Sequence, residues 1–342
     1  LQKQVGQILK QKENFGQLNI GKNKKIQIEF ISANPTGPLT VGNARGGPLG
    51  DTLANVFQKV GFKVFREYYI NDVGKQIELL NDSLGGKDGY KNPYIDELKK
   101  ERVRDAKKAV DFIVKKIKKT TERMKIKFDQ WFYESNLYKK KEVDQVINFL
   151  KKKGLTYEKE GALWFKSSKY GDERDRVIVK SDNSKTYLAG DIAYHRHKFE
   201  KEKFTQVINI WGADHYGDVP GLQAGVSALG HQGKLDVILL QFVTLIEKGK
   251  GLKMSKRKGV YVSMDELLET AGSDAARFFF LQKSASTHLN FDLSLAKEQS
   301  EKNPVFYIQY AHARICAILR KTKTVDVGDQ QVKLLKHPSE LI

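Results

Sequence analysis

The chain has 342 residues, of which 40% are hydrophobic and 30% charged, with a formal net charge of +19. This predicts one large α/β domain with appendages, and no apolar run approaches the roughly eighteen residues that cross a bilayer. A single cysteine, Cys316, excludes an internal disulfide framework and a Cys-rich zinc site, so no protein-bound zinc is expected. The positive charge favours nucleic acid as a partner about as much as it favours a merely solvated surface.

The first elements predict the opening of a nucleotide-binding α/β fold. Residues 1–24 are polar and indicate a helical remnant and a loop, without an initiator Met or signal peptide, as in the interior of a longer cytoplasmic polypeptide. Residues 26–30 alternate apolar and polar side chains, which is typical of a strand. A Pro- and Gly-rich turn follows at 34–39, then a helix that Gly61 stops and a second strand at 62–69. This order favours a Rossmann-like, doubly wound parallel sheet.

The later elements predict an insertion, the second half of the sheet and a final helix. Residues 75–150 are mostly helical in pattern, and 99–125 carry twelve Lys or Arg against four Asp or Glu, which favours a solvated helix face over a nucleic-acid contact. Short strands are expected within 161–180, and buried parallel strands at 206–211 and 236–243. A capping box at Ser263 opens a helix that ends near Gly272, and another helix begins at Pro304.

Two distant segments each follow a predicted strand. Residues 32–46 form a glycine-containing turn that opens a helix, where backbone N–H groups and the helix dipole favour phosphate. Residues 251–259 form a loop rich in lysine and arginine. Either segment alone is common in α/β proteins. Together the two segments predict a pair of loops that bind one triphosphate from two sides.

Both segments resemble signatures of the class I aminoacyl-tRNA synthetases. Residues 253–257 are KMSKR, and residues 33–46 are similar to the arginyl form of the HIGH motif. Five further segments resemble arginyl-tRNA synthetases in the same order: 67–72 (EYYIND), 128–132 (FDQWF), 161–165 (GALWF), 211–215 (WGADH) and 303–307 (NPVFY). The resemblance covers roughly residues 15–320.

The resemblance implies which residues hold the substrates. Those matched to the arginine site are Glu29, Asn34, Tyr187, Asp191 and His215. Those matched to ATP binding are Pro38, Thr40, Gly42, Asn43, Gly46, Met254, Ser255 and Lys256, and the catalytic set is Lys256, Lys253, Gly42, Asn43 and Thr40. The arginine assignment agrees with chemistry, because a guanidinium is planar, permanently charged and best matched by carboxylates.

The sequence departs from the family at two positions. Thr40 and Asn43 stand where the family usually has histidines that stabilise negative charge on the phosphates. Threonine and asparagine donate hydrogen bonds but cannot become cationic, and one lost transition-state donor can cost on the order of 10²-fold in rate. In one interpretation, the neutral donors and Lys256 stabilise the negative charge on the phosphates well enough for catalysis. In the other the chain is a catalytically impaired tRNA-binding paralogue. The surviving KMSKR loop and arginine-site residues favour activity.

The expected function is that of an arginine–tRNA ligase. It would use ATP with Mg²⁺ and act on L-arginine and tRNA(Arg), as a cytoplasmic monomer without membrane contact. Besides the impaired paralogue, a synthetase for another amino acid and a metabolic nucleotidyltransferase are alternatives. The expected regions are a remnant (1–24), the first half of the catalytic fold (25–80), a mostly helical basic insertion (81–180), the second half with the KMSKR loop (181–302) and the start of a helical anticodon-binding domain (303–342).

Overall fold

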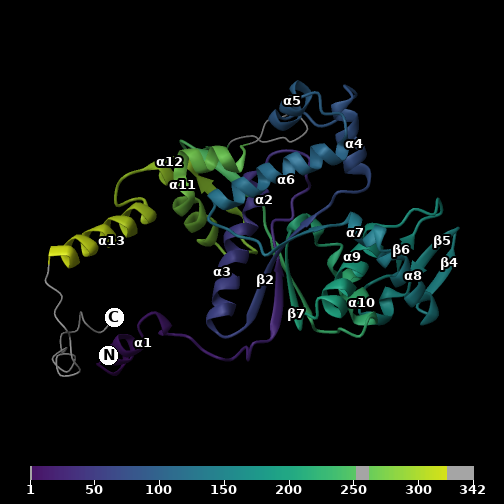
Figure 1. Ribbon diagram of the computed structural model, residues 1–342, viewed down its shortest axis with the longest axis horizontal. Coiled ribbons are helices and arrows are strands. Elements are labelled where there is room, and N and C mark those ends of the chain that lie inside the picture. The colour runs from purple at the N-terminus through teal and green to yellow at the C-terminus, as the bar shows by residue number, and fades with distance from the viewer. Residues whose placement is uncertain (1, 252–261, 322–342) are drawn as a thin grey trace.

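The computed structural model describes residues 2–251 and 262–321. Its centre is a parallel sheet of five strands in the order β3-β2-β1-β7-β8 (Figure 1). The strands are β1 (Lys25–Glu29), β2 (Lys63–Ile70), β3 (Gln130–Tyr133), β7 (Gln206–Gly212) and β8 (Leu235–Leu240). The strand order reverses between β1 and β7, so the sheet is doubly wound as predicted. In such sheets ligands bind outside the carboxyl ends of the strands at this reversal.

The first predicted unit of strand, turn, helix and strand is confirmed. Helix α2 (Val41–Ala44) leads into α3 (Gly46–Lys59), which lies against the sheet. A side chain at Gly50 would place its Cβ 2.3 Å from the ring of Phe30, so glycine allows α3 to approach the end of β1 closely. The helix stops before Gly61, whose φ of 92° favours glycine.

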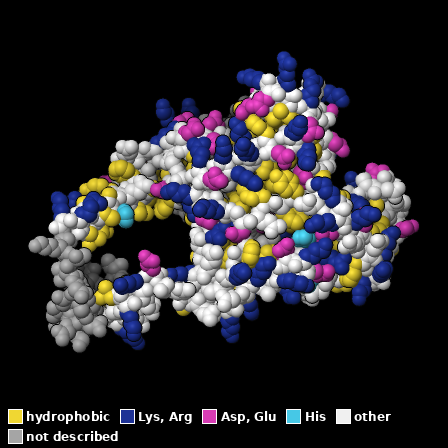
Figure 2. Space-filling model, in the orientation of Figure 1, with side chains coloured by type: hydrophobic (Ala, Val, Ile, Leu, Met, Phe, Trp, Pro, Cys, Tyr) yellow, Lys and Arg dark blue, Asp and Glu magenta, His cyan; other side chains and the backbone are white. Residues whose placement is uncertain are grey.

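The region between β2 and β3 is helical and basic. It contains α4 (Lys75–Leu84), α5 (Pro93–Lys100) and α6 (Ala106–Arg123). The apolar stripe of α6, including Val110, Ile113 and Ile117, is buried against α4, α5 and β2. Figure 2 shows Lys and Arg side chains across the face that carries these helices. Strand β3 was not predicted, because four residues between long helices give too short an alternating pattern.

A second core surrounds α9. It is built by α7 (Ser135–Lys139), α8 (Glu142–Lys152), α9 (Tyr187–Arg196), α10 (Val219–Ala228) and the antiparallel sheet of β4 (Thr156–Lys159), β5 (Ala162–Phe165) and β6 (Arg176–Val179). The helical path of α9 continues as one wider turn, η3 (His197–Lys201). The two strands predicted within 161–180 are confirmed as β5 and β6, and β4 is an addition.

The predicted strand at 236–243 divides between two sheets. Strand β8 ends at Leu240, and β9 (Val243–Glu247) pairs with β10 (Lys250–Gly251) and β11 (Leu289–Asp292). The helix predicted from Ser263 is α11 (Met264–Leu281); it breaks at Gly272 (φ 78°, ψ 164°) and then continues. Helices α12 (Leu293–Lys297) and α13 (Pro304–Lys321) follow, and α1 (Gln2–Gln11) lies near the N-terminus (Figure 1). Among the described helices, none has the length and apolarity to cross a membrane.

Candidate active site

A cavity of about 1790 Å³ lies at the carboxyl ends of β1, β2 and β7. It exceeds the roughly 300–1,000 Å³ of a typical pocket for one small ligand. The chain leaves β1 through Ile31 and Ser32, whose φ values are 68° and 40°. This backbone region is costly for a β-branched residue such as Ile31. The Ser32 hydroxyl holds the turn by accepting the backbone N–H of Tyr69 at 3.1 Å, and the next residues then line the cavity.

Three carboxylates line one end of the cavity, which we call the acidic end: Glu29 at the end of β1, Glu134 directly after β3 and Asp191 on α9. Burial raises the pKa of Asp191 to about 8, and the charges of Glu134 and Glu29 add to the shift. Burial likewise raises the pKa of Glu134 to about 7. Carboxylates crowded in this way resist ionisation until a cation joins them. The acidic end is therefore suited to a positively charged ligand.

Glu29 already has a cationic partner. Its Oε2 accepts a hydrogen bond from Nζ of Lys198 at 2.6 Å, and both side chains are buried. The Lys198 ammonium also lies 4.0 Å from the ring centre of Tyr194. Glu67, the neighbour of Glu29 on β2, accepts hydrogen bonds from Tyr194 and from Gln27, and burial raises its pKa to about 7. One oxygen of Glu29 is thus engaged within the protein.

The other residues of the predicted arginine site line the same cavity. Asn34 is exposed in the turn after β1. Tyr187 begins α9 and is 65% exposed, so its ring is available to a ligand. His215 ends the short helix η4 (Ala213–His215), and its Nδ1 lies 3.3 Å from Oδ2 of Asp218. The structure therefore brings all five predicted arginine-site residues to one cavity.

A second group of cavity-lining residues, which we call the nucleotide end, comes from the turn before α2. Pro38, Thr40 and Asn43 belong to it. The Thr40 hydroxyl donates to Oδ1 of Asn43 at 2.6 Å and accepts the backbone N–H of Asn43 at 3.3 Å, which caps α2. The two residues that replace the family histidines are thus bonded to each other. Both side chains line the cavity wall, and both are uncharged polar groups of the kind that hydrogen-bond to phosphate.

The two predicted glycines of this segment lie outside the cavity lining. Gly42 is within α2, and Gly46 is buried where an added Cβ would lie 3.2 Å from Leu240. Between these two glycines in sequence lies Arg45, whose buried guanidinium donates to the backbone carbonyls of Gln241, Ser284 and Thr287. Arg45 and Gly46 therefore connect the nucleotide end to the segments around residues 240–241 and 284–287.

The four predicted residues of the KMSKR loop, Lys253, Met254, Ser255 and Lys256, lie outside the described residues. The chain that follows them contacts the nucleotide end directly. The backbone N–H of Met264 donates to the carbonyl of Leu39 at 2.7 Å, and Thr40 forms an antiparallel bridge with Ser263. Segments more than 220 residues apart in sequence are thereby joined beside the cavity.

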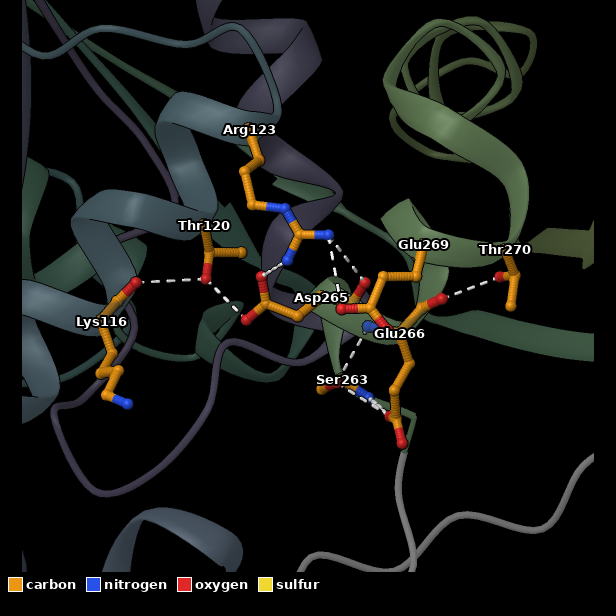
Figure 3. A network of polar contacts seen from close by, with 8 residues as sticks. All are labelled: Lys116, Thr120, Arg123, Ser263, Asp265, Glu266, Glu269 and Thr270. Carbon is orange, nitrogen blue, oxygen red and sulfur yellow. Dashed lines mark hydrogen bonds and ion pairs between the residues drawn. The ribbon is translucent and has the colours of Figure 1, made fainter. Parts of the chain in front are cut away.

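Figure 3 shows what holds the start of α11. Ser263 and Glu266 form the predicted capping box. Asp265 accepts a hydrogen bond from the buried hydroxyl of Thr120 at 2.8 Å and pairs with Arg123, both on α6. The residues after the KMSKR loop are therefore fixed to the basic helical region as well as to the turn before α2.

Comparison with known proteins identifies the family. Residues 4–100 and 91–290 match the family described as tRNA synthetases class I (R), catalytic domain. The chain belongs to this family. Across 99% of its length it is 42% identical to arginine–tRNA ligase 1 of Halalkalibacterium halodurans, and across 98% it is 44% identical to the arginine–tRNA ligase of Caldanaerobacter subterraneus. It covers 67% and 66% of those proteins, so it spans about two thirds of their length.

A solved structure supports the same assignment. An arginyl-tRNA synthetase structure from Campylobacter jejuni superposes with a TM-score of 0.85 at 37% identity, covering 94% of this chain and 76% of that one. The sequence-based resemblance to class I synthetases and the predicted fold class are both confirmed.

Two charged residues at or behind the acidic end were not predicted from the sequence. Glu134 follows β3 directly, so its place at the carboxyl end of a strand was the available signal, but the strand itself was missed. Lys198 gave no signal, because it is one of many lysines in the chain and its partner, Glu29, is 169 residues away.

Proposed function

We propose that the chain is the catalytic part of an arginine–tRNA ligase, which activates L-arginine with ATP and transfers it to the 3′ end of tRNA(Arg). One observation carries the proposal: a single cavity joins a group of carboxylates to the turn that carries the phosphate-binding signature. Glu134 and Asp191 would receive the guanidinium, whose planar set of five N–H donors matches paired carboxylates. Glu29, Asn34, Tyr187 and His215 would complete the arginine site.

The reaction would proceed in two steps at this cavity. A carboxylate oxygen of arginine attacks the α-phosphorus of ATP in line, and the bond from that phosphorus to the bridging oxygen of pyrophosphate breaks. The terminal ribose hydroxyl of tRNA then attacks the arginyl carbonyl, and AMP leaves. The protein contributes position and charge stabilisation, without a covalent intermediate on the enzyme.

The nucleotide end would hold the triphosphate. The family resemblance assigns Asn43, Thr40 and the backbone of Gly42, at the start of α2, to contact the phosphates. The family resemblance assigns Lys256, assisted by Lys253, to neutralise the departing pyrophosphate. Mg²⁺ would accompany ATP mainly through phosphate oxygens and water, which is the usual way this ion binds nucleotides.

Binding of the tRNA partner is expected to involve α13. Several apolar side chains of α13 are exposed, among them Tyr307, Ile315 and Leu319. Figure 2 shows hydrophobic side chains along that helix. They support the expectation that α13 begins a helical part that binds the anticodon. We expect this chain to bind ATP and arginine. The monomeric state and cytoplasmic location stay predictions.

An exchange assay tests the proposed function. Incorporation of labelled pyrophosphate into ATP is expected with arginine and tRNA present, and not with lysine or cysteine in place of arginine. Exchange with another amino acid would assign a different synthetase. Arginine binding in calorimetry without any exchange would favour the impaired tRNA-binding paralogue, for which Thr40 and Asn43 are the supporting residues.

A further inference from the structure

A chain of buried hydrogen bonds runs behind the acidic end of the cavity. It begins at the backbone carbonyl of Asp191, which lies 2.8 Å from Nδ1 of His195. The Asn209 amide nitrogen lies 2.9 Å from Nε2 of the same ring, so a neutral imidazole with its proton on Nδ1 satisfies both contacts. Lys198 then donates to Oδ1 of Asn209 at 3.3 Å and to Glu29 at 2.6 Å. The chain thus connects the residues that carry two of the cavity's carboxylates.

Three structural elements are joined by these contacts. Asp191 and His195 lie on α9, and Lys198 lies on the turn η3 that continues it. Asn209 is in β7 and Glu29 is at the end of β1, the two strands where the strand order reverses. His195, Lys198, Asn209 and Glu29 are all buried. A buried network whose members are all bonded holds its elements in one arrangement.

Lys198 also sets the charge balance at the acidic end. Its ammonium lowers the pKa values of Glu67 and Asp191, against the larger effect of burial, which raises them. With burial, the same charge keeps the pKa of His195 well below its usual range, which maintains the neutral imidazole of the chain. Glu29 is compensated directly by its ion pair. At the acidic end, Glu134 and Asp191 are the two carboxyls whose pKa values burial raises to about 7 and about 8, and these two would gain most from a bound cation.

We propose that Lys198 is a positioning residue for the substrate cation: it engages Glu29, fixes α9 against β1 and β7, and so reserves Glu134 and Asp191 for the guanidinium. This inference rests on the proposed function. Without the ammonium, Glu29 becomes an unpaired carboxylate in the cavity wall. It would then compete for the guanidinium and hold arginine away from its reactive position.

The test compares Lys198→Met with Lys201→Met by calorimetry. Methionine preserves most of the length of the side chain and removes the charge. Lys201 is the matched control, because it lies on the same turn but pairs with Glu142, at 2.8 Å, outside the cavity lining. Lys198→Met is expected to weaken arginine binding at least tenfold while ATP affinity changes less than twofold. Lys201→Met is expected to change neither. Arginine affinity within threefold of the unsubstituted chain, or equal losses for arginine and ATP, would overturn the proposal.

A double variant keeps the test decisive if Lys198→Met does not fold. Glu29→Gln with Lys198→Met removes both charges and leaves no unpaired carboxylate at this position. Because the loss arises through Glu29, the double variant is expected to bind arginine within threefold of Glu29→Gln alone. A further tenfold loss in the double variant would show that Lys198 acts independently of Glu29, against the proposal.

Failure of this inference can be told apart from failure of the proposed function. If the unsubstituted chain binds no arginine, the proposed function fails and this inference fails with it. If the chain binds arginine but the Lys198 substitution does not change the affinity, only the inference is overturned.

Discussion

The acidic end and the nucleotide end of the cavity are held in place by different kinds of contact. At the acidic end, buried side chains bond to one another: Lys198 to Glu29, and Tyr194 to Glu67. At the nucleotide end, backbone groups carry most of the contacts, as between Leu39 and Met264 or around the guanidinium of Arg45. In the proposed function, buried charge would therefore set specificity for the amino acid, and the meeting of two distant segments would form the phosphate site.

This difference predicts that the two ends can be damaged separately. Changes at the acidic end should alter arginine affinity with little effect on ATP. Changes at the nucleotide end should alter the rate of adenylate formation with little effect on arginine affinity. A variant that affected both equally would show that the cavity works as one unit.

The largest expected effect is that of Asp191→Ala. Removing one carboxylate from a buried charged contact costs about 2–5 kcal/mol, so we expect arginine affinity to fall on the order of 100-fold or more while ATP affinity is retained. Calorimetry with each ligand measures this. Asp236→Ala, at an exposed position on β8, is the control and should bind arginine normally. Arginine affinity unchanged by Asp191→Ala would remove this residue from the site.

Asn43→Ala should affect the rate. The substitution removes the amide donors from the nucleotide end and leaves the acidic end intact. We expect the rate of pyrophosphate exchange to fall roughly 10- to 100-fold with arginine affinity unchanged. Asn290→Ala, exposed on β11, serves as the control. Equal loss of rate and of arginine affinity would contradict the separation of the two ends.

Restoring the family histidines sharpens the same comparison. In Thr40→His with Asn43→His, two imidazoles, which can become cationic, replace the bonded pair of Thr40 and Asn43. If neutral donors suffice, as we expect, exchange should change less than about tenfold, since each new donor replaces an existing one. A much larger gain would identify the chain as an impaired paralogue instead.

Arginine affinity should rise with pH. In the free protein the pKa values of Asp191 and Glu134 are raised to about 8 and about 7, so both carboxyls hold protons at pH 6. A bound guanidinium favours their ionised forms, and binding therefore releases protons. Affinity should increase between pH 6 and 8, by at most about tenfold per pH unit for each proton released. Calorimetry in buffers with different ionisation enthalpies measures the release directly. A flat profile would show that the carboxyls are ionised before arginine binds.

The sequence predicted most of the sheet because its strands alternate or are continuously apolar, as in 26–30 and 206–211. It missed β3, which is four residues long. It also joined β8 to β9, because one polar residue, Gln241, is too short an interruption of the apolar run at 237–243 to mark the end of a strand. In the site, Glu29, Asn34 and Asp191 followed from the family resemblance. Lys198 could not be predicted, because its role depends on a tertiary contact across 169 residues.

The smallest effect we expect concerns the contact between α6 and the start of α11 in Figure 3. Thr120→Val removes the hydroxyl that donates to Asp265 and keeps the shape of a side chain that is 1% exposed. Asp265 retains Arg123, a pair exposed enough to be screened by solvent, so the loss should be about 1 kcal/mol in the free energy of unfolding. Thr270→Val, whose hydroxyl bonds within α11 itself, is the matched control. Urea unfolding measures the free energy of unfolding of both variants.

If the start of α11 positions the nucleotide end, Thr120→Val should also raise the KM for ATP severalfold and leave arginine affinity unchanged. Thr270→Val should change neither quantity. A KM for ATP identical in the two variants would mean that this contact stabilises the fold without setting the geometry of the nucleotide end.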